Sequence, residues 1–151
     1  MNKPMMKANL RMWSDHVSFK QNLDGISEKI EVIYDAGDRI VTGKGIVSTA
    51  LAKQNYISTV DDDIEDEFSA CIWIERKIDI LIKTPIHQLI VSGDVQATLW
   101  LAIFEPSNLI ENKKLPELSD KANEANMELF LEDYTDLSIG GNPRKYHLGK
   151  K

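Results

Sequence analysis

Apolar and polar residues alternate along the chain from Phe68 to Lys83. The even positions in this stretch are almost all apolar, whereas the odd positions include Ser69, Glu75 and Lys77. A repeat of two residues is typical of a β-strand with one buried face. Because the stretch is long for a single strand, we expect a bulge near Arg76 and an end at Pro85.

The alternation continues with the opposite phase from Leu89 to Ile103, where apolar residues hold the odd positions. The turn-forming residues 92–94 (Ser-Gly-Asp) interrupt it. A three-residue loop at this point sets Val91 opposite Val95, so that apolar side chains face each other across a hairpin. We therefore predict that residues 68–104 are extended strands.

Weaker patterns predict further strands earlier in the chain. Residues 30–34 and 56–60 alternate in the same way, and residues 40–47 form another extended apolar stretch. The turn-forming residues around Ala36 and Gly37 predict a hairpin that joins residues 30–34 to residues 40–47.

Two segments fit helices. Residues 14–30 carry apolar residues on one side, with Ser14 or Asp15 as the cap. Residues 118–134 place apolar residues at spacings of four, three and four, as an amphipathic helix does.

These elements predict an α+β fold. We expect a mostly antiparallel sheet, curled or in the form of a half barrel, with one C-terminal amphipathic helix and an N-terminal helix. Residues 1–135 are expected to form a single globular domain, and residues 136–151, with Gly140, Gly141 and Pro143, a flexible tail.

Composition narrows the range of functions. The chain has 151 residues, of which 42% are apolar, and no apolar run approaches the length that spans a membrane. Its formal net charge of −6 argues against nucleic acid as a partner, because phosphate binding draws on clustered Lys and Arg. One cysteine and no signal-peptide pattern in residues 1–12 predict a cytoplasmic protein.

The acidic charge is concentrated in one run. Residues 61–67 contain six carboxylates in seven positions, beginning with Asp61, Asp62 and Asp63. Such a density of like charges favours a solvated loop. We expect this run to guide a partner with a basic surface.

Three aromatic residues occupy the polar phase of the predicted strands. Trp73, Trp100 and Phe104 should therefore project from the same, supposedly wet face of the sheet. Either a helix of the chain covers this face, or it binds a partner, since exposed aromatic residues are typical binding anchors. We predict a noncatalytic protein-binding module of the adaptor, inhibitor, immunity or assembly-factor type.

Two alternatives remain open, and no cofactor is expected in the binding module. Glu75-Arg76-Lys77 resembles the Glu-x-Lys motif of metal-dependent nucleases, in which Asp62 or Asp63 would help Glu75 to hold magnesium beside Lys77. A small molecule could instead bind inside a curled sheet. An exposed edge strand would also allow self-association into a homo-oligomer.

Overall fold

The computed structural model describes residues 5–21, 29–41, 47–135 and 142–149. Within these ranges, seven strands form one sheet: β1 (Met6–Ser14), β2 (Ile30–Tyr34), β5 (Asn55–Thr59), β6 (Asp62–Ile64), β7 (Gln96–Ile103), β8 (Glu128–Asp133) and β9 (Arg144–Gly149). A separate hairpin consists of β3 (Arg39–Val41) and β4 (Val47–Leu51). The described helices are α1 (Glu67–Ile82), α2 (Ile86–Ser92) and α3 (Lys114–Glu124).

The sheet runs in the order β2-β5-β1-β7-β8-β9, and β6 pairs with β1 beyond the end of β5. Neighbouring strands are antiparallel except β7 and β8, which α3 connects as a parallel pair. The predicted α+β class with a mostly antiparallel sheet is therefore confirmed, and the sheet is open rather than closed into a barrel.

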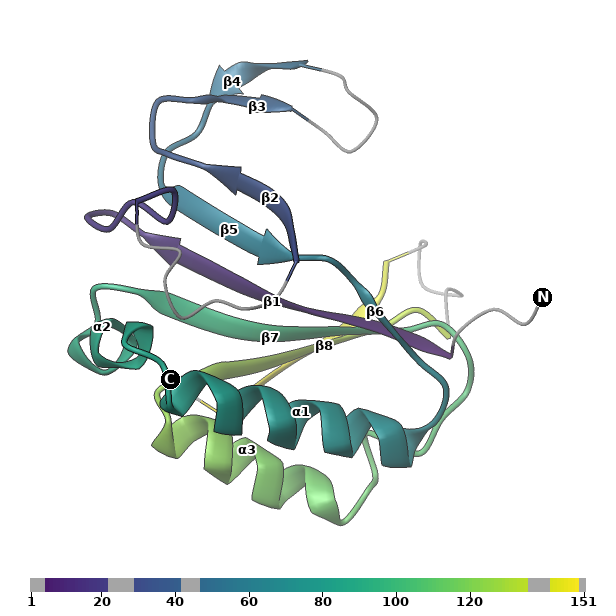
Figure 1. Ribbon diagram of the computed structural model, residues 1–151. Helices are drawn as coiled ribbons and strands as arrows, with labels where there is room; N and C mark the ends of the chain where they lie inside the picture. The colour runs from purple at the N-terminus through teal and green to yellow at the C-terminus, as the bar shows by residue number, and fades with distance from the viewer. Residues whose placement is uncertain (1–4, 22–28, 42–46, 136–141, 150–151) are drawn as a thin grey trace.

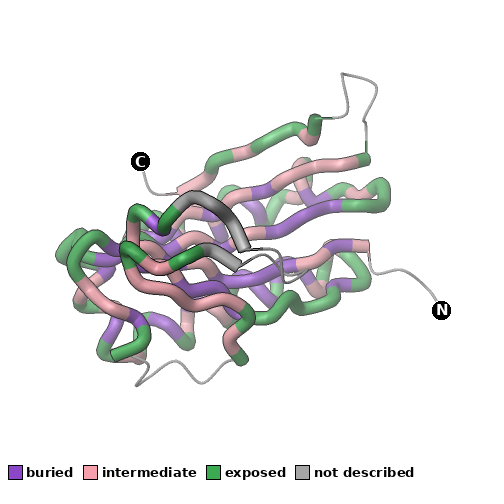
Figure 2. The backbone as a smooth tube through the Cα atoms, turned by 90° about the horizontal axis from the view of Figure 1, so that it is seen from above, coloured by how far each residue is buried: buried purple, intermediate pink, exposed green. Residues whose placement is uncertain are grey.

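Helices α1 and α3 lie side by side on one face of the sheet (Figure 1). The core forms between them and the strands, because the even positions of β1 and the odd positions of β7 and β8 are buried on this side. Burial is deepest at the central strands, whereas β9 at the edge is intermediate or exposed throughout (Figure 2). None of the described helices covers the other face of the sheet (Figure 1).

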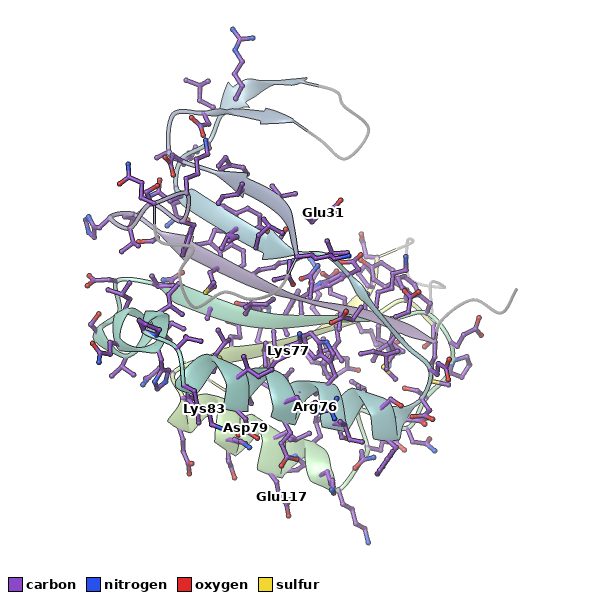
Figure 3. The ribbon with its side chains drawn as sticks, in the orientation of Figure 1. Glu31, Arg76, Lys77, Asp79, Lys83 and Glu117 are labelled. Atoms are coloured by element: carbon purple, nitrogen blue, oxygen red, sulfur yellow. The ribbon has the colours of Figure 1, made fainter. Side chains whose placement is uncertain are left out.

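The prediction of strands over residues 68–83 is wrong, because this segment is α1. Asp66 caps the helix, and its side chain accepts a hydrogen bond from the Ser69 amide at 2.7 Å. Side chains such as Arg76, Lys77 and Asp79 are therefore distributed around a helix (Figure 3).

Apolar residues on both sides of α1 produced the false alternation. Ala70, Ile74 and Ile78 are buried and lie four residues apart, a spacing that fits both a helix and the even positions of a strand. The other even positions are filled by exposed apolar residues, namely Phe68, Ile72, Ile80 and Ile82. An ordinary amphipathic helix would carry polar residues there.

The predicted hairpin at residues 92–94 is also wrong. Residues 86–92 form α2, and Gly93 ends it in the left-handed conformation with φ of 89°. From Gln96 onward the prediction is confirmed: β7 is a strand whose odd positions are buried.

The two predicted helices differ from the structure as well. Ser14 ends β1, where its Oγ accepts hydrogen bonds from the amides of His16 and Val17, and residues 15–21 form bends and turns rather than a helix. The rest of that predicted helix, up to residue 28, lies outside the described residues. In the second segment, α3 ends at Glu124 and the chain turns at Asn126 (φ 59°) into β8.

The remaining predictions are confirmed in part. Residues 30–34 and 55–59 are strands, but β2 pairs with β5 and β3 with β4, so no hairpin forms around Gly37 between β2 and β3. Part of the predicted tail belongs to the sheet, because residues 144–149 pair with β8 as strand β9. Residues 136–141 lie outside the described part of the chain.

Candidate functional site

The sheet face opposite α1 and α3 carries a group of aromatic side chains, which we call the aromatic face. Its rings belong to Trp13, Tyr34, Tyr56, Trp100, Phe130 and His147. They meet because strand register aligns them: Trp13 lies opposite Tyr56, and Tyr56 opposite Tyr34. Trp100 likewise lies opposite Phe130, and Phe130 opposite His147.

The rings form two clusters. The centroids of Tyr34 and Tyr56 are 5.2 Å apart, and those of Tyr56 and Trp13 are 5.3 Å apart. At the other side, the rings of Phe130 and His147 are 4.5 Å apart. These separations are typical of favourable aromatic pairs, so the rings hold one another in place.

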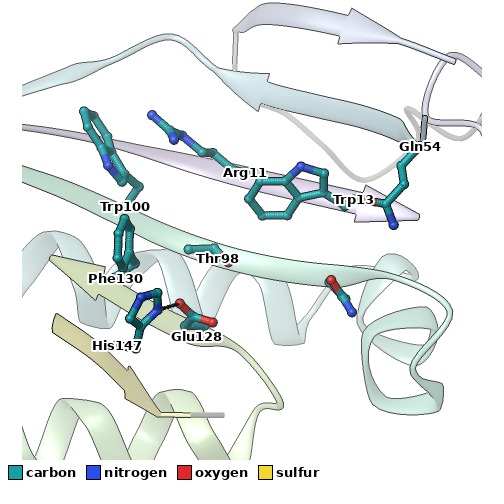
Figure 4. Close-up of a pocket in the computed structure, with 9 residues that line it drawn as sticks. Arg11, Trp13, Gln54, Thr98, Trp100, Glu128, Phe130 and His147 are labelled. Carbon is teal, nitrogen blue, oxygen red and sulfur yellow. Dashed lines mark hydrogen bonds and ion pairs between the residues drawn. The ribbon is translucent and has the colours of Figure 1, made fainter. Parts of the chain in front are cut away.

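A pocket lies between the two clusters (Figure 4). Thr98 is aligned with Arg11 on one side and Glu128 on the other, and its short side chain leaves a hollow among larger neighbours. The hollow has a volume of about 380 Å³, and its walls include Trp13, Trp100 and Phe130. Its rim is polar, with Gln54, Gln96 and the His147 ring, whose Nδ1 lies 2.7 Å from Glu128 Oε1.

Hydrogen bonds connect the pocket to the acidic run. Asn9 donates to Asp61 Oδ1 through Nδ2 at 2.7 Å and accepts a bond from Arg11 Nε at 3.1 Å. The guanidinium of Arg11 lies over Trp100, with Cζ 4.2 Å from the ring centroid. This contact is a cation–π interaction that orients both side chains.

The same network continues to the end of β7. Trp100 Nε1 donates to Glu132 Oε1 at 2.5 Å, and the hydroxyl of Tyr134 donates to Glu132 Oε2 at 2.9 Å. The Tyr134 ring stacks on Phe104 with a centroid separation of 5.5 Å. Burial, together with the hydrogen bond to Glu132, raises the pKa of Tyr134 above its ordinary value, which keeps the hydroxyl protonated as a donor.

The structure divides the predicted binding residues between two surfaces. Asp61, Trp100 and Phe104 belong to one connected network on the aromatic face. Trp73 does not, because it lies on α1, is 9% exposed, and donates through Nε1 to Asp62 Oδ2 at 2.8 Å. The expectation that Trp73 shares a sheet face with Trp100 is therefore wrong.

The acidic run is not one solvated loop. Asp62 and Asp63 belong to β6, where Asp63 is exposed and aligned with Lys7 of β1. Asp66 caps α1, and Glu67 Oε1 accepts a hydrogen bond from the Asn108 amide at 3.0 Å. Secondary structure thus spreads these carboxylates over a strand, a cap and a helix.

Arg11, Trp13, Phe130 and His147 were missed as site residues, although the sequence contained a signal for two of them. Met6, Ala8, Leu10 and Met12 alternate with Lys7, Asn9, Arg11 and Trp13, which is the pattern of a strand with one buried face. Phe130 gave no such signal, because its segment was interpreted as helix.

Glu75 and Lys77 do not share one side of a strand, as the nuclease alternative expected. Glu75 and Lys77 lie on a helix, where positions two apart point about 200° away from each other rather than to one side. Glu75 contacts Lys121 at 3.8 Å, whereas Lys77 contacts Asp62 at 3.7 Å. Among the described residues, no group of three or more His, Cys, Asp and Glu side chains is arranged to hold a metal ion.

Comparison of the chain with models of known protein families, with curated proteins and with solved structures finds no match. In the described ranges, every helix is too short or too polar to cross a membrane.

Proposed function

We propose that this domain is a noncatalytic binding module for another protein, and that the aromatic face receives the partner. The observation that carries the proposal is the network from Asp61 through Arg11 and Trp100 to Phe104, which holds large rings in place on a face that no described helix covers. Trp, Tyr and Arg dominate binding hot spots, and side chains held in advance lose little entropy on binding.

The partner would insert an apolar side chain into the pocket above Thr98. The walls of this pocket include rings, and Gln96 and Arg11, which also line it, carry hydrogen-bond donors. The net charge of −6 and the exposed carboxylates of Asp61 and Asp63 favour a partner with a basic surface, because opposite charges speed encounter. We place this interaction in the cytoplasm, since a single cysteine forms no intramolecular disulfide.

A small-molecule ligand is the second candidate. The pocket volume of about 380 Å³ lies within the usual range of ligand sites, and the mixture of rings with a few polar groups is typical of them. An aromatic compound could occupy the space that we assign to a partner side chain.

The proposal is tested by filling the pocket. Thr98→Tyr replaces the floor with a larger residue that also favours strands, so the fold is retained while the hollow closes. The matched control is Val91→Tyr, because Val91 is 55% exposed on α2 and does not line the pocket. Wild type and control should capture the same stoichiometric protein from a lysate of the native host, and Thr98→Tyr should lose it.

Two results would contradict the proposal. If Thr98→Tyr captured the same protein as wild type does, the aromatic face would not be the binding surface. A thermal stabilisation of wild type by small compounds, lost in Thr98→Tyr and accompanied by no protein complex, would favour the second candidate.

A further inference from the structure

Helix α1 carries a ridge of exposed side chains on its outer side. The ridge consists of Phe68, Ile72, Arg76 and Ile80, each four residues from the next. Its apolar members are large and accessible, with Phe68 69%, Ile72 38% and Ile80 44% exposed. From Phe68 to Ile80 it extends for about 18 Å along the helix.

A groove runs beside this ridge, between α1 and β6. It has a volume of about 430 Å³, and its apolar lining includes Ile64, Ile72, Trp73 and Ile80. Helices associate by fitting the ridge of one into a groove beside the ridge of another, and residues four apart form the commonest type of ridge. The outer side of α1 therefore has the shape of a helix-packing surface, although none of the described elements packs on the exposed ridge residues.

Charge is distributed unequally along the ridge. Exposed acidic residues, Asp63 and Glu65, lie near its N-terminal end. The exposed basic residue Lys83 lies at its C-terminal end, whereas Arg76 belongs to the middle of the ridge (Figure 3). Asp79 lies nearby but is paired with Lys121 at 2.7 Å. Glu65 and Lys83 form no ion pair with any residue in the described part of the chain. A surface of this kind is complementary to itself when two copies meet with these helices antiparallel.

We propose that the occupant of this ridge is a second copy of the chain, related by a twofold axis, with the two α1 helices antiparallel. Centring the pair on position 74 sets Phe68 opposite Ile80 of the second copy and Glu65 opposite Lys83 of the second copy. The same alignment sets Ile72 opposite Arg76, whose aliphatic stem can cover the isoleucine while its charge remains in water. Every apolar member of the ridge thus gains a partner, and Glu65 at one end of each ridge meets Lys83 at the opposite end of the other.

Self-complementarity favours a second copy over an unrelated protein. A twofold interface requires that each residue pair occur twice with the roles exchanged, and the three pairs named above satisfy this condition with residues of α1 and its two flanks. Helix α1, which carries the ridge, lies on the side of the sheet opposite to the aromatic face (Figure 1), so this inference does not rest on the proposed function.

Sedimentation analysis of the purified full chain tests the inference. Wild type should show a concentration-dependent monomer–dimer equilibrium. Ile72→Lys should raise the dissociation constant at least about 30-fold, because it removes a central apolar contact and sets a second cation opposite Arg76 of the other copy. The matched control is Val91→Lys, which makes the same kind of change at an exposed apolar residue off the ridge and should leave the constant unchanged. Circular dichroism verifies that both variants are folded.

Charge reversal tests the antiparallel register. Glu65→Lys and Lys83→Glu should each raise the dissociation constant of the dimer, by about two- to fivefold for each of the two symmetry-related pairs. The double variant should restore the wild-type dissociation constant. A monomeric wild type at every soluble concentration overturns the inference, as does a dimer unaffected by Ile72→Lys. Failure of the double variant to recover affinity overturns the register.

Discussion

The indole nitrogen of Trp73 donates a hydrogen bond to Asp62 and so joins α1 to β6, with 2.8 Å between Nε1 and Oδ2. Lys77 strengthens this junction, because its Nζ lies 3.7 Å from Asp62 Oδ2 and 5.6 Å from the centroid of the Trp73 ring. Trp73, which was predicted to be a binding anchor, and Asp62, which was predicted to guide a partner, therefore contribute to the attachment of the helix to the strand.

Asp62→Ala should lower the free energy of unfolding by about 1 kcal/mol, since it removes the acceptor of a largely buried N–H group while the carboxylate itself is partly screened by water. The neighbouring Asp63→Ala is the control and should remain within about 0.5 kcal/mol of wild type. Urea denaturation followed by tryptophan fluorescence measures both. Equal effects of the two substitutions would show that the Trp73 bond contributes nothing.

Asp66 should make stability depend on pH in the acid range. Hydrogen bonds from Ser69 lower the pKa of Asp66 below its ordinary value. A carboxyl whose pKa is lower in the folded state stabilises the fold above the unfolded-state pKa of about 3.9, and this contribution is lost as pH falls through the folded-state pKa.

Two variants of Asp66 separate the contribution of its hydrogen bond to the helix cap from the contribution of its negative charge. Asp66→Ala should lower the urea midpoint at neutral pH, because the Ser69 amide loses its acceptor. Asp66→Asn keeps an acceptor and should retain most of the midpoint at neutral pH while losing the acid-range dependence. An unchanged acid dependence in Asp66→Asn would refute the assignment to this residue.

Tyr134 should contribute to a loss of stability at alkaline pH. Its pKa is raised chiefly by burial and then by Glu132, so the folded state retains the phenolic proton longer than the unfolded chain does. The resulting stabilisation is complete below the unfolded-state pKa of about 10 and is lost as pH rises through the folded-state pKa. Tyr134→Phe keeps the ring against Phe104 and should show a shallower alkaline decline in urea midpoints; parallel curves for the two proteins would contradict this.

Gly149 should tolerate substitution poorly. Its φ is +85°, and a Cβ atom there would lie 2.9 Å from the carbonyl oxygen of Met127. Gly149→Ala should lower the free energy of unfolding by about 2–3 kcal/mol, because the backbone strain at positive φ and the collision with the carbonyl oxygen add. Gly93→Ala is the control, since Gly93 has a similar φ of +89° but open space around it, and should cost about 1 kcal/mol. Thermal unfolding compares the two, and equal costs would argue against the collision.

The sequence predicted β7 correctly and α1 incorrectly for one physical reason. Strand β7 has a single buried face, so Leu99 and Leu101 alternate cleanly with Thr98 and Trp100. Helix α1 is apolar on two sides, and the sum of its buried and exposed stripes imitates a strand. The cap formed by Asp66 with Ser69 was the available sign of a helix start, and the acidic run concealed it.

The sequence predicted a residue of the candidate site only where it also predicted the strand that carries or precedes that residue. Trp100 and Phe104 were found because the phase of residues 96–104 was correct. Trp13 was missed because the alternation of residues 6–13 was not interpreted as a strand. Phe130 was missed because β8 was interpreted as part of a helix, since a spacing of four, three and four ran on from α3 through the turn at Asn126. Which strands become neighbours, and hence which rings meet, depends on contacts between residues far apart in the chain, such as Asn9 and Trp100.

The position of β1 inside the sheet has a consequence for biosynthesis. One edge of β1 pairs with β5 and β6, which leave the ribosome soon after β1 does. The other edge of β1 stays unpaired until residues 96–103 have been synthesised. Until those residues are translated, the nascent chain displays unpaired backbone groups along a strand that carries Met6, Leu10 and Met12 on one side, a template on which neighbouring chains aggregate. Premature termination before β7 would make that hazard permanent.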